Sequence, residues 1–157
     1  MNEKKYFLIS KITDYLDFLE NIKGLSANTI KSYQRDLIKF SHFSEAANVD
    51  SFDMFTEEIC SSWIADLFRQ NVSARSIQRH ISSAKGFFEY AQKNTLINGS
   101  PFELINSPKS PNYLPNVLSP EDVEQLLNFK PKNIQETRDM AIVELIYSSG
   151  LRVSEAV

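Results

Sequence analysis

An arginine near the carboxyl end of the chain stands where its guanidinium could be held in a fixed direction. Gly150 can adopt the left-handed conformation that ends a helix, and Arg152 follows it in the turn. A guanidinium is permanently charged, and its fork of donors matches two phosphate oxygens, so it suits a phosphoryl transition state. Glu155 can hold that side chain or simply pair with it on the surface. On these residues alone, a solvated arginine after a helix is the alternative.

Charge is distributed unevenly along the first hundred residues. Residues 23–39 hold four basic side chains against one acid, and residues 69–93 hold five against one. Residues 40–68, which lie between them, hold six acids and neither Lys nor Arg. The formal net charge of the chain is −3, but local sign decides what a surface attracts within about one Debye length, roughly 8–10 Å. The two basic stretches indicate phosphate contacts, with ordinary solvated helix faces as the alternative.

The elements that carry these residues are expected to be helices, because apolar residues recur at helical spacing and no segment alternates with period two. We predict an all-α fold. The four predicted helices begin near residue 6 and at the capping residues Ser26, Thr56 and Ser73. Residues 44–55 are expected to form a loop. Gly86 lies inside the fourth helix, where glycine costs about 1 kcal/mol relative to alanine, so close packing against a neighbour is expected there.

A proline-rich stretch divides the chain. Five of the six prolines lie between residues 101 and 120, and proline stiffens a connection and cannot continue a helix. We therefore predict a helical domain at 1–99, a linker at 100–118 and a second domain at 119–157. A helix at 134–149 is apolar almost all round and is expected in a core. Because residues 119–157 offer it too little partner surface, we expect them to be the start of a longer domain.

Composition narrows the class of protein further. The single cysteine, Cys60, cannot form an internal disulfide, and the spacing of residues offers no metal site. No apolar run approaches the ~18 residues of a membrane span, and the amino terminus does not have the pattern of a signal peptide. We expect a cytoplasmic location and no membrane partner.

The segment RDMAIVELIYSSGLRVSEAV, residues 138–157, resembles the first active-site segment of the tyrosine recombinases. LPNVLSPEDVEQLL, residues 114–127, resembles their entry into the catalytic domain. Residues 26–40 and 76–105 resemble their SAM-like core-binding domain of four helices. The likeness spans nearly the whole chain and is strongest to the Xer-type resolvases of chromosome dimers.

The resemblance implies that a tyrosine hydroxyl attacks a DNA phosphodiester to form a 3′-phosphotyrosyl intermediate, without metal or cofactor. It implies that Arg152 clamps the scissile phosphate and that Glu155 supports the site. No other catalytic residue of the family is matched, so we expect the 157 residues alone to be inactive. His42 and His80 do not match the family's catalytic positions. Tyr147 is expected in a core rather than as the nucleophile.

The resemblance also implies partners. The first domain would clamp double-stranded DNA through its second and fourth helices. Further partners would be other recombinase protomers, in a homo- or heterotetramer on the DNA, and a DNA translocase. The expected DNA-contacting side chains lie in the two basic stretches: Lys31, Ser32, Arg35, Arg75, Arg79 and Lys85. Alternatives are a phage or mobile-element integrase, a non-catalytic DNA-binding module, and a helical protein-interaction domain.

Overall fold

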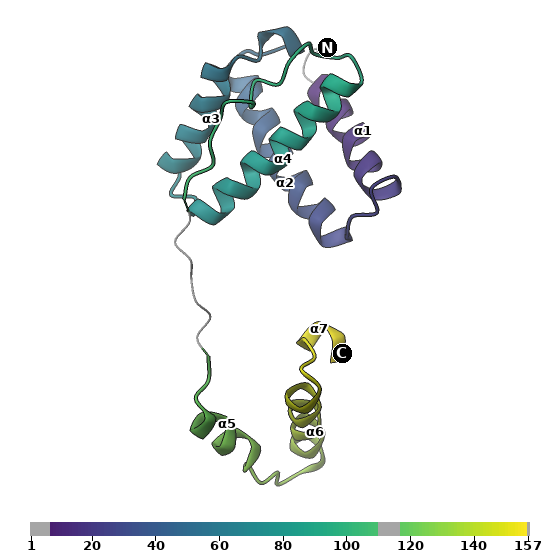
Figure 1. Cartoon of the computed structure of the whole chain (residues 1–157), viewed down its shortest axis with the longest axis vertical. Helices are drawn as coiled ribbons and strands as arrows, with labels where there is room; N and C mark the ends of the chain where they lie inside the picture. Colours follow the sequence, from purple (N-terminus) through teal and green to yellow (C-terminus); the bar gives the residue numbers. More distant parts are fainter. Residues whose placement is uncertain (1–6, 110–116, 157) are drawn as a thin grey trace. The chain divides into compact units, whose positions relative to one another are not determined.

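The computed structural model describes residues 7–109 and 117–156, and within these ranges it contains helices and no strand. This confirms the predicted all-α class (Figure 1). The helices, in chain order, are α1 (Phe7–Asn21), α2 (Ala27–Ala46), the short 3₁₀ turn η2 (Phe52–Met54), α3 (Glu57–Arg69), α4 (Ala74–Lys93), α5 (Pro120–Leu127), α6 (Ile134–Ser149) and α7 (Val153–Ala156).

The chain forms two compact units, Met1–Pro111 and Asn112–Val157. The first unit extends beyond α4, because Phe102 is fully buried in it and Ile105 is 6% exposed. The amide of Gln78 on α4 also donates to the main-chain oxygen of Pro108 (2.7 Å). Residues 100–109, here called the strap, therefore pack on the helices. The boundary between the units, at 111/112, falls inside the predicted linker 100–118.

The core of the first unit is largely aromatic. In Figure 1, α4 crosses in front of α2, and α1 and α3 flank them. The Phe40 ring of α2 lies 4.7 Å from the Trp63 ring of α3 and 5.9 Å from the Phe88 ring of α4, measured between centroids. Phe102 of the strap lies 5.9 Å from Phe40 in the same cluster. These contacts fix the two helices that carry the basic stretches.

Helix starts follow the predicted caps. Ser26, Thr56 and Ser73 each accept a hydrogen bond from the backbone N–H three residues on, which satisfies one of the free donors of a first turn. Ser119 and Asp122 form a capping box at the start of α5.

The segment between α2 and α3 differs from the loop expected at 44–55. The second helix continues to Ala46, and η2 follows it. Val49 and Phe55 are buried, so apolar side chains anchor this connection in the core.

Gly86 of α4 confirms the expected close approach. A Cβ added there would overlap the hydroxyl of Tyr15 on α1.

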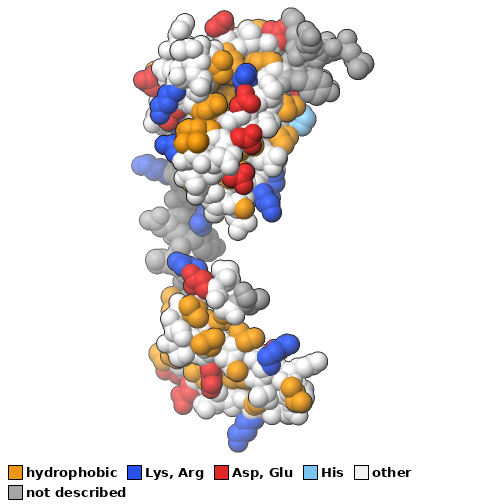
Figure 2. Space-filling model, turned by 90° about the vertical axis from the view of Figure 1, so that its right-hand side faces the viewer, with side chains coloured by type: hydrophobic (Ala, Val, Ile, Leu, Met, Phe, Trp, Pro, Cys, Tyr) orange, Lys and Arg blue, Asp and Glu red, His pale blue; other side chains and the backbone are white. Residues whose placement is uncertain are grey.

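The second unit has no buried residue among those described, although α6 was expected in a core. Figure 2 shows hydrophobic side chains on its surface. Tyr147 is 62% exposed and Leu145 is 48% exposed, so the core position expected for Tyr147 is not what the structure shows. The physical reason is that α5 and α7, the helices that pack against α6, are too short to cover it.

Candidate nucleic-acid interface

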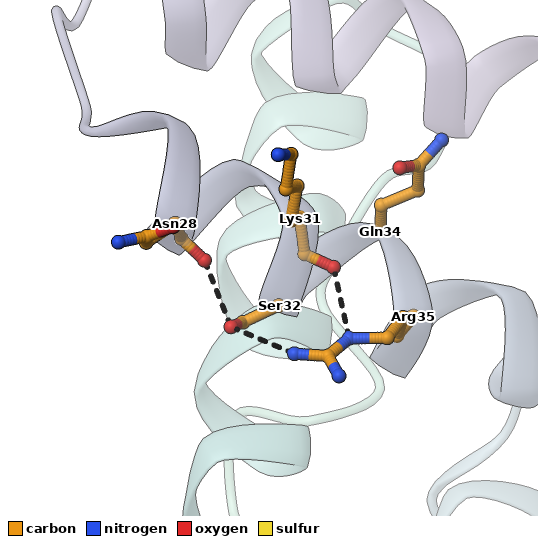
Figure 3. A pocket seen from close by; sticks show the side chains of 5 residues that line it. All are labelled: Asn28, Lys31, Ser32, Gln34 and Arg35. Carbon is orange, nitrogen blue, oxygen red and sulfur yellow. Dashed lines mark hydrogen bonds between the residues drawn. The ribbon is translucent and has the colours of Figure 1, made fainter.

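The amino-terminal half of α2 carries three predicted side chains around one hollow. Lys31, Ser32 and Arg35 line it together with Asn28 and Gln34, and its volume is about 530 Å³ (Figure 3). They share this surface because residues three and four apart lie on one side of a helix. Lys31 and Arg35 are exposed and Ser32 is half-buried. Lys31 and Arg35 form no ion pair with another described residue.

The guanidinium of Arg35 lies back along its own helix (Figure 3). Its Nε donates to the main-chain oxygen of Lys31 (3.3 Å) and its Nη2 to the hydroxyl oxygen of Ser32 (3.4 Å). The Ser32 hydroxyl donates in turn to the main-chain oxygen of Asn28 (2.8 Å). Neutral oxygens hold this arginine, so its positive charge is left for an external anion.

The fourth helix carries Arg75 and, one turn later, Arg79. Arg75 is exposed and forms no ion pair with another residue in the described part of the chain. Arg79 reaches across to α2, where its Nε donates to Oδ2 of Asp36 (2.7 Å) and its Nη2 to Oδ1 (2.9 Å). This bidentate pair links the two helices that carry all six predicted DNA-contacting residues.

Sequence reasoning missed Asp36 and the neighbouring His80 as a buried polar cluster. Asp36 is 1% exposed and His80 is 2% exposed, and Nδ1 of His80 lies 3.3 Å from Oδ1 of Asp36. The His80 ring meets the Trp63 ring edge-on at 5.7 Å. Burial lowers the pKa of His80, although the Asp36 carboxylate acts in the opposite direction. Spacing along each helix could have revealed them, because Asp36 and His80 lie three or four residues from the apolar residues that face the core.

Lys85 lies on a different face of α4. It is six residues from Arg79, which places it about 120° around the helix. It is half-buried and lines a hollow of about 290 Å³ with Glu89 of α4 and Glu103 of the strap. The structure therefore does not bring Lys85 together with Arg75 and Arg79.

In the second unit, Arg152 and Glu155 form a local pair. Gly150 ends α6 in the left-handed conformation (φ +63°), as predicted. The backbone N–H of Arg152 donates to Oε2 of Glu155 (2.8 Å), and its Nη1 donates to Oε1 (3.0 Å). The two side chains are 82% and 44% exposed, respectively. Glu155 thus holds both the turn and the guanidinium while leaving most of the arginine accessible.

Two kinds of site are absent from residues 7–109 and 117–156. No group of three or more His, Cys, Asp or Glu side chains could hold a metal ion. None of the helices there has the length and apolarity that a bilayer span needs.

The chain is similar to curated proteins over most of its length. The chain is 35% identical over 147 residues to the tyrosine recombinase XerD of Staphylococcus aureus (strain Mu50 / ATCC 700699). The aligned region covers 93% of this chain and 50% of that protein. It is 36% identical over 148 residues to XerD of Staphylococcus haemolyticus (strain JCSC1435), with the same coverage. The chain therefore spans about half the length of these curated relatives.

A solved structure shares the fold. The integrase from mycobacterium phage Brujita matches with a TM-score of 0.58 and 23% sequence identity, over 98% of this chain and 48% of that one. The family model described as "Phage integrase, N-terminal SAM-like domain" matches residues 12–94, which include most of α1 and all of α2 and α3, together with α4. That match covers more than half of the chain and shows that the chain belongs to the phage integrase family through its N-terminal SAM-like domain.

Proposed function

We propose that this chain is the DNA-clamping part of a tyrosine recombinase that cuts and rejoins double-stranded DNA through a 3′-phosphotyrosyl intermediate. The observation that carries the proposal is the set of basic side chains on α2 and α4, in a chain 35% identical to a tyrosine recombinase over 147 residues. The identity to XerD favours chromosome dimer resolution in the cytoplasm, with other recombinase protomers and a DNA translocase as partners.

Both helices have the dimensions for this role. Each is 20 residues long, which corresponds to about 30 Å at 1.5 Å per residue. The major groove of B-DNA, about 12 Å wide, admits a helix of this kind. Lys31, Arg35, Arg75 and Arg79 would bind backbone phosphates and so set the position of the domain on the duplex. Ser32 fixes Arg35, and Lys85 would meet DNA only along another side of α4.

Arg152 is proposed as the catalytic arginine that binds the scissile phosphate. Its guanidinium is accessible and its turn is fixed by Glu155, which is the arrangement that phosphate binding requires. Because the resemblance matches no other catalytic residue here, we propose that these 157 residues bind duplex DNA without cleaving it.

The binding proposal is tested by fluorescence anisotropy with a labelled 30-base-pair duplex of mixed sequence, titrated at several KCl concentrations. Lys31→Ala and Arg35→Ala should each weaken binding by about tenfold and reduce the salt slope by about one. Arg69→Ala is the matched control. Although Arg69 begins the basic stretch 69–93, it lies at the end of α3 rather than on α2 or α4, and it already pairs with Asp66 (3.2 Å), so this variant should bind as the parent does. No binding by the parent even at low salt would leave the helical protein-interaction domain as the better description.

The catalytic proposal is tested in a form of the protein that includes a complete catalytic domain. Arg152→Ala should abolish strand cleavage on a suicide substrate and leave duplex binding within about twofold. Wild-type cleavage by that variant would overturn the assignment. Binding without any cleavage by the parent would favour a non-catalytic DNA-binding module. Strand exchange confined to attachment sites of a phage or mobile element would favour an integrase.

A further inference from the structure

We infer that Asp36 is a positioning residue for DNA binding: it holds the guanidinium of Arg79 by one edge and leaves a second donor edge for a DNA phosphate. The inference rests on the proposed function and adds to it a residue that makes no contact with DNA itself. It also assigns Arg79 two simultaneous partners, one within the protein and one outside it.

The Asp36–Arg79 pair spans the border between core and solvent. The side chain of Asp36 is 2% exposed, whereas that of Arg79 is 43% exposed. The two hydrogen bonds, of 2.7 and 2.9 Å, have the short length of charge-assisted bonds. The carboxylate thus lies inside the domain, and the guanidinium covers it at the surface.

A guanidinium has more than one donor edge. The edge formed by Nε and Nη2 is used by the two oxygens of Asp36. Nη1 and the second hydrogen of Nη2 form another edge, and no acceptor for Nη1 lies among the described residues. Five N–H donors in a rigid plane allow both edges to be used together. The arginine can therefore bind a phosphate without releasing Asp36.

Arg79 supplies both of the side-chain hydrogen bonds described for the Asp36 carboxylate, and the neighbouring His80 does not supply another. Nδ1 of His80 lies 3.3 Å from Oδ1 of Asp36, yet this nitrogen is buried without a hydrogen-bond partner in the described part of the structure. The positive charges of Lys39 on α2 and Arg79 on α4 also lower the pKa of His80. A buried carboxylate left unpaired is strongly unfavourable, so the carboxylate keeps the guanidinium in place.

The test compares Asp36→Asn with Asp66→Asn in the 157-residue chain. Both changes remove one negative charge beside an arginine, but Asp66 pairs with Arg69 on α3 at 3.2 Å, and its side chain is 32% exposed, whereas that of Asp36 is 2% exposed. If Asp36 acted only through its charge, both variants should bind DNA more tightly, because each removes a negative charge that repels the phosphates. Positioning predicts that Asp36→Asn binds the 30-base-pair mixed-sequence duplex about three- to tenfold more weakly, while Asp66→Asn binds as tightly as the parent or slightly tighter.

Two further measurements keep the inference falsifiable if Asp36→Asn fails to fold. Arg79→Lys retains the charge but replaces the planar fork by a single ammonium group, so it should lose about tenfold in affinity rather than match the parent. In the parent, the ¹⁵N-correlated Nε–Hε signal of Arg79 should be resolved in the free protein and should shift when duplex is added.

The outcomes separate the two proposals. Absence of duplex binding by the parent would overturn the proposed function, and this inference with it. Binding by the parent, with Asp36→Asn or Arg79→Lys equal to it or tighter, would overturn the positioning role alone. An Arg79 signal that does not respond to duplex would do the same.

Discussion

Tyr15 of α1 lies over Gly86 of α4, and its hydroxyl occupies the space that a Cβ at position 86 would need. The Tyr15 ring is buried and held by Phe87, whose centroid is 5.7 Å away, and by Tyr90 at 5.4 Å. The ring therefore cannot swing away freely. This contact explains a glycine inside a long helix, where alanine is ordinarily better by about 1 kcal/mol.

Gly86→Ala is expected to destabilise the first unit by about 1–3 kcal/mol, because the added methyl group overpacks the contact with Tyr15. Urea unfolding followed by circular dichroism measures the change. The control is Tyr15→Phe, which removes the overlapping oxygen and leaves the ring carbon in ordinary contact at 3.5 Å. In that background the same substitution should be neutral or stabilising. Equal destabilisation in both backgrounds would contradict the role of the hydroxyl.

The buried His80 is expected to make the first unit less stable in mild acid. Burial lowers the pKa of His80 below its ordinary value of 6.5, so the unfolded chain binds a proton more readily than the folded one. The stability that neutral His80 contributes is complete above pH 6.5 and is lost as the pH falls below it. The slope should approach, at most, about 1.4 kcal/mol per pH unit.

Unfolding free energies between pH 7.5 and 5.5 test this expectation. His80→Phe keeps a ring against Trp63 but cannot titrate, so its profile should be flatter than that of the parent. His42→Gln is the control, because His42 is an exposed histidine on α2, and it should keep the parent's profile. Parallel profiles for the parent and His80→Phe would count against a buried neutral histidine.

Phe102 is expected to be among the most costly residues to truncate, although it lies outside the four helices. It is fully buried against Phe88 and Trp63 at 5.4 and 6.1 Å. Phe102→Ala should lower the free energy of unfolding by about 3–5 kcal/mol. Leu104→Ala is the matched control, because Leu104 is 73% exposed and should change stability by less than about 0.5 kcal/mol. A small effect of Phe102→Ala would return the domain boundary to residue 99.

Cys60 is expected to be unreactive in the folded chain. It is fully buried, and burial raises the pKa of its thiol to about 12, so almost no thiolate is present at pH 8. Labelling with iodoacetamide should be negligible in native buffer and complete in guanidinium chloride. Rapid native labelling would show that the space between α3 and its neighbours opens far more often than this packing implies.

Much of this fold could be predicted from the sequence, because helical periodicity, capping serines and a glycine stop are local signals. Ser26, Thr56 and Ser73 mark three helix starts correctly. The strap was missed because its prolines resemble those of a linker, whereas its course depends on where Phe102 finds space in the core. Local composition does not contain that information.

The candidate interface was predictable only in part, for a similar reason. The basic character of α2 and α4 follows from spacing along each helix. Whether Arg79 faces solvent or an acid on another helix depends on packing between residues 43 positions apart. Lys85 shows the same limit, since a count of charges along the chain does not say which face of α4 carries them.

The Asp36–Arg79 pair also has an evolutionary consequence. Replacing Arg79 alone would leave the Asp36 carboxylate unpaired in the interior, which costs about 3–5 kcal/mol in pairs of this kind. Replacing Asp36 alone would leave the partly exposed Arg79 guanidinium without its partner. Replacing both by apolar residues can be tolerated by the domain but would remove the arginine from its surface. These two positions are therefore expected to change together among related sequences, and relatives without the pair are expected to carry a different cation at this surface.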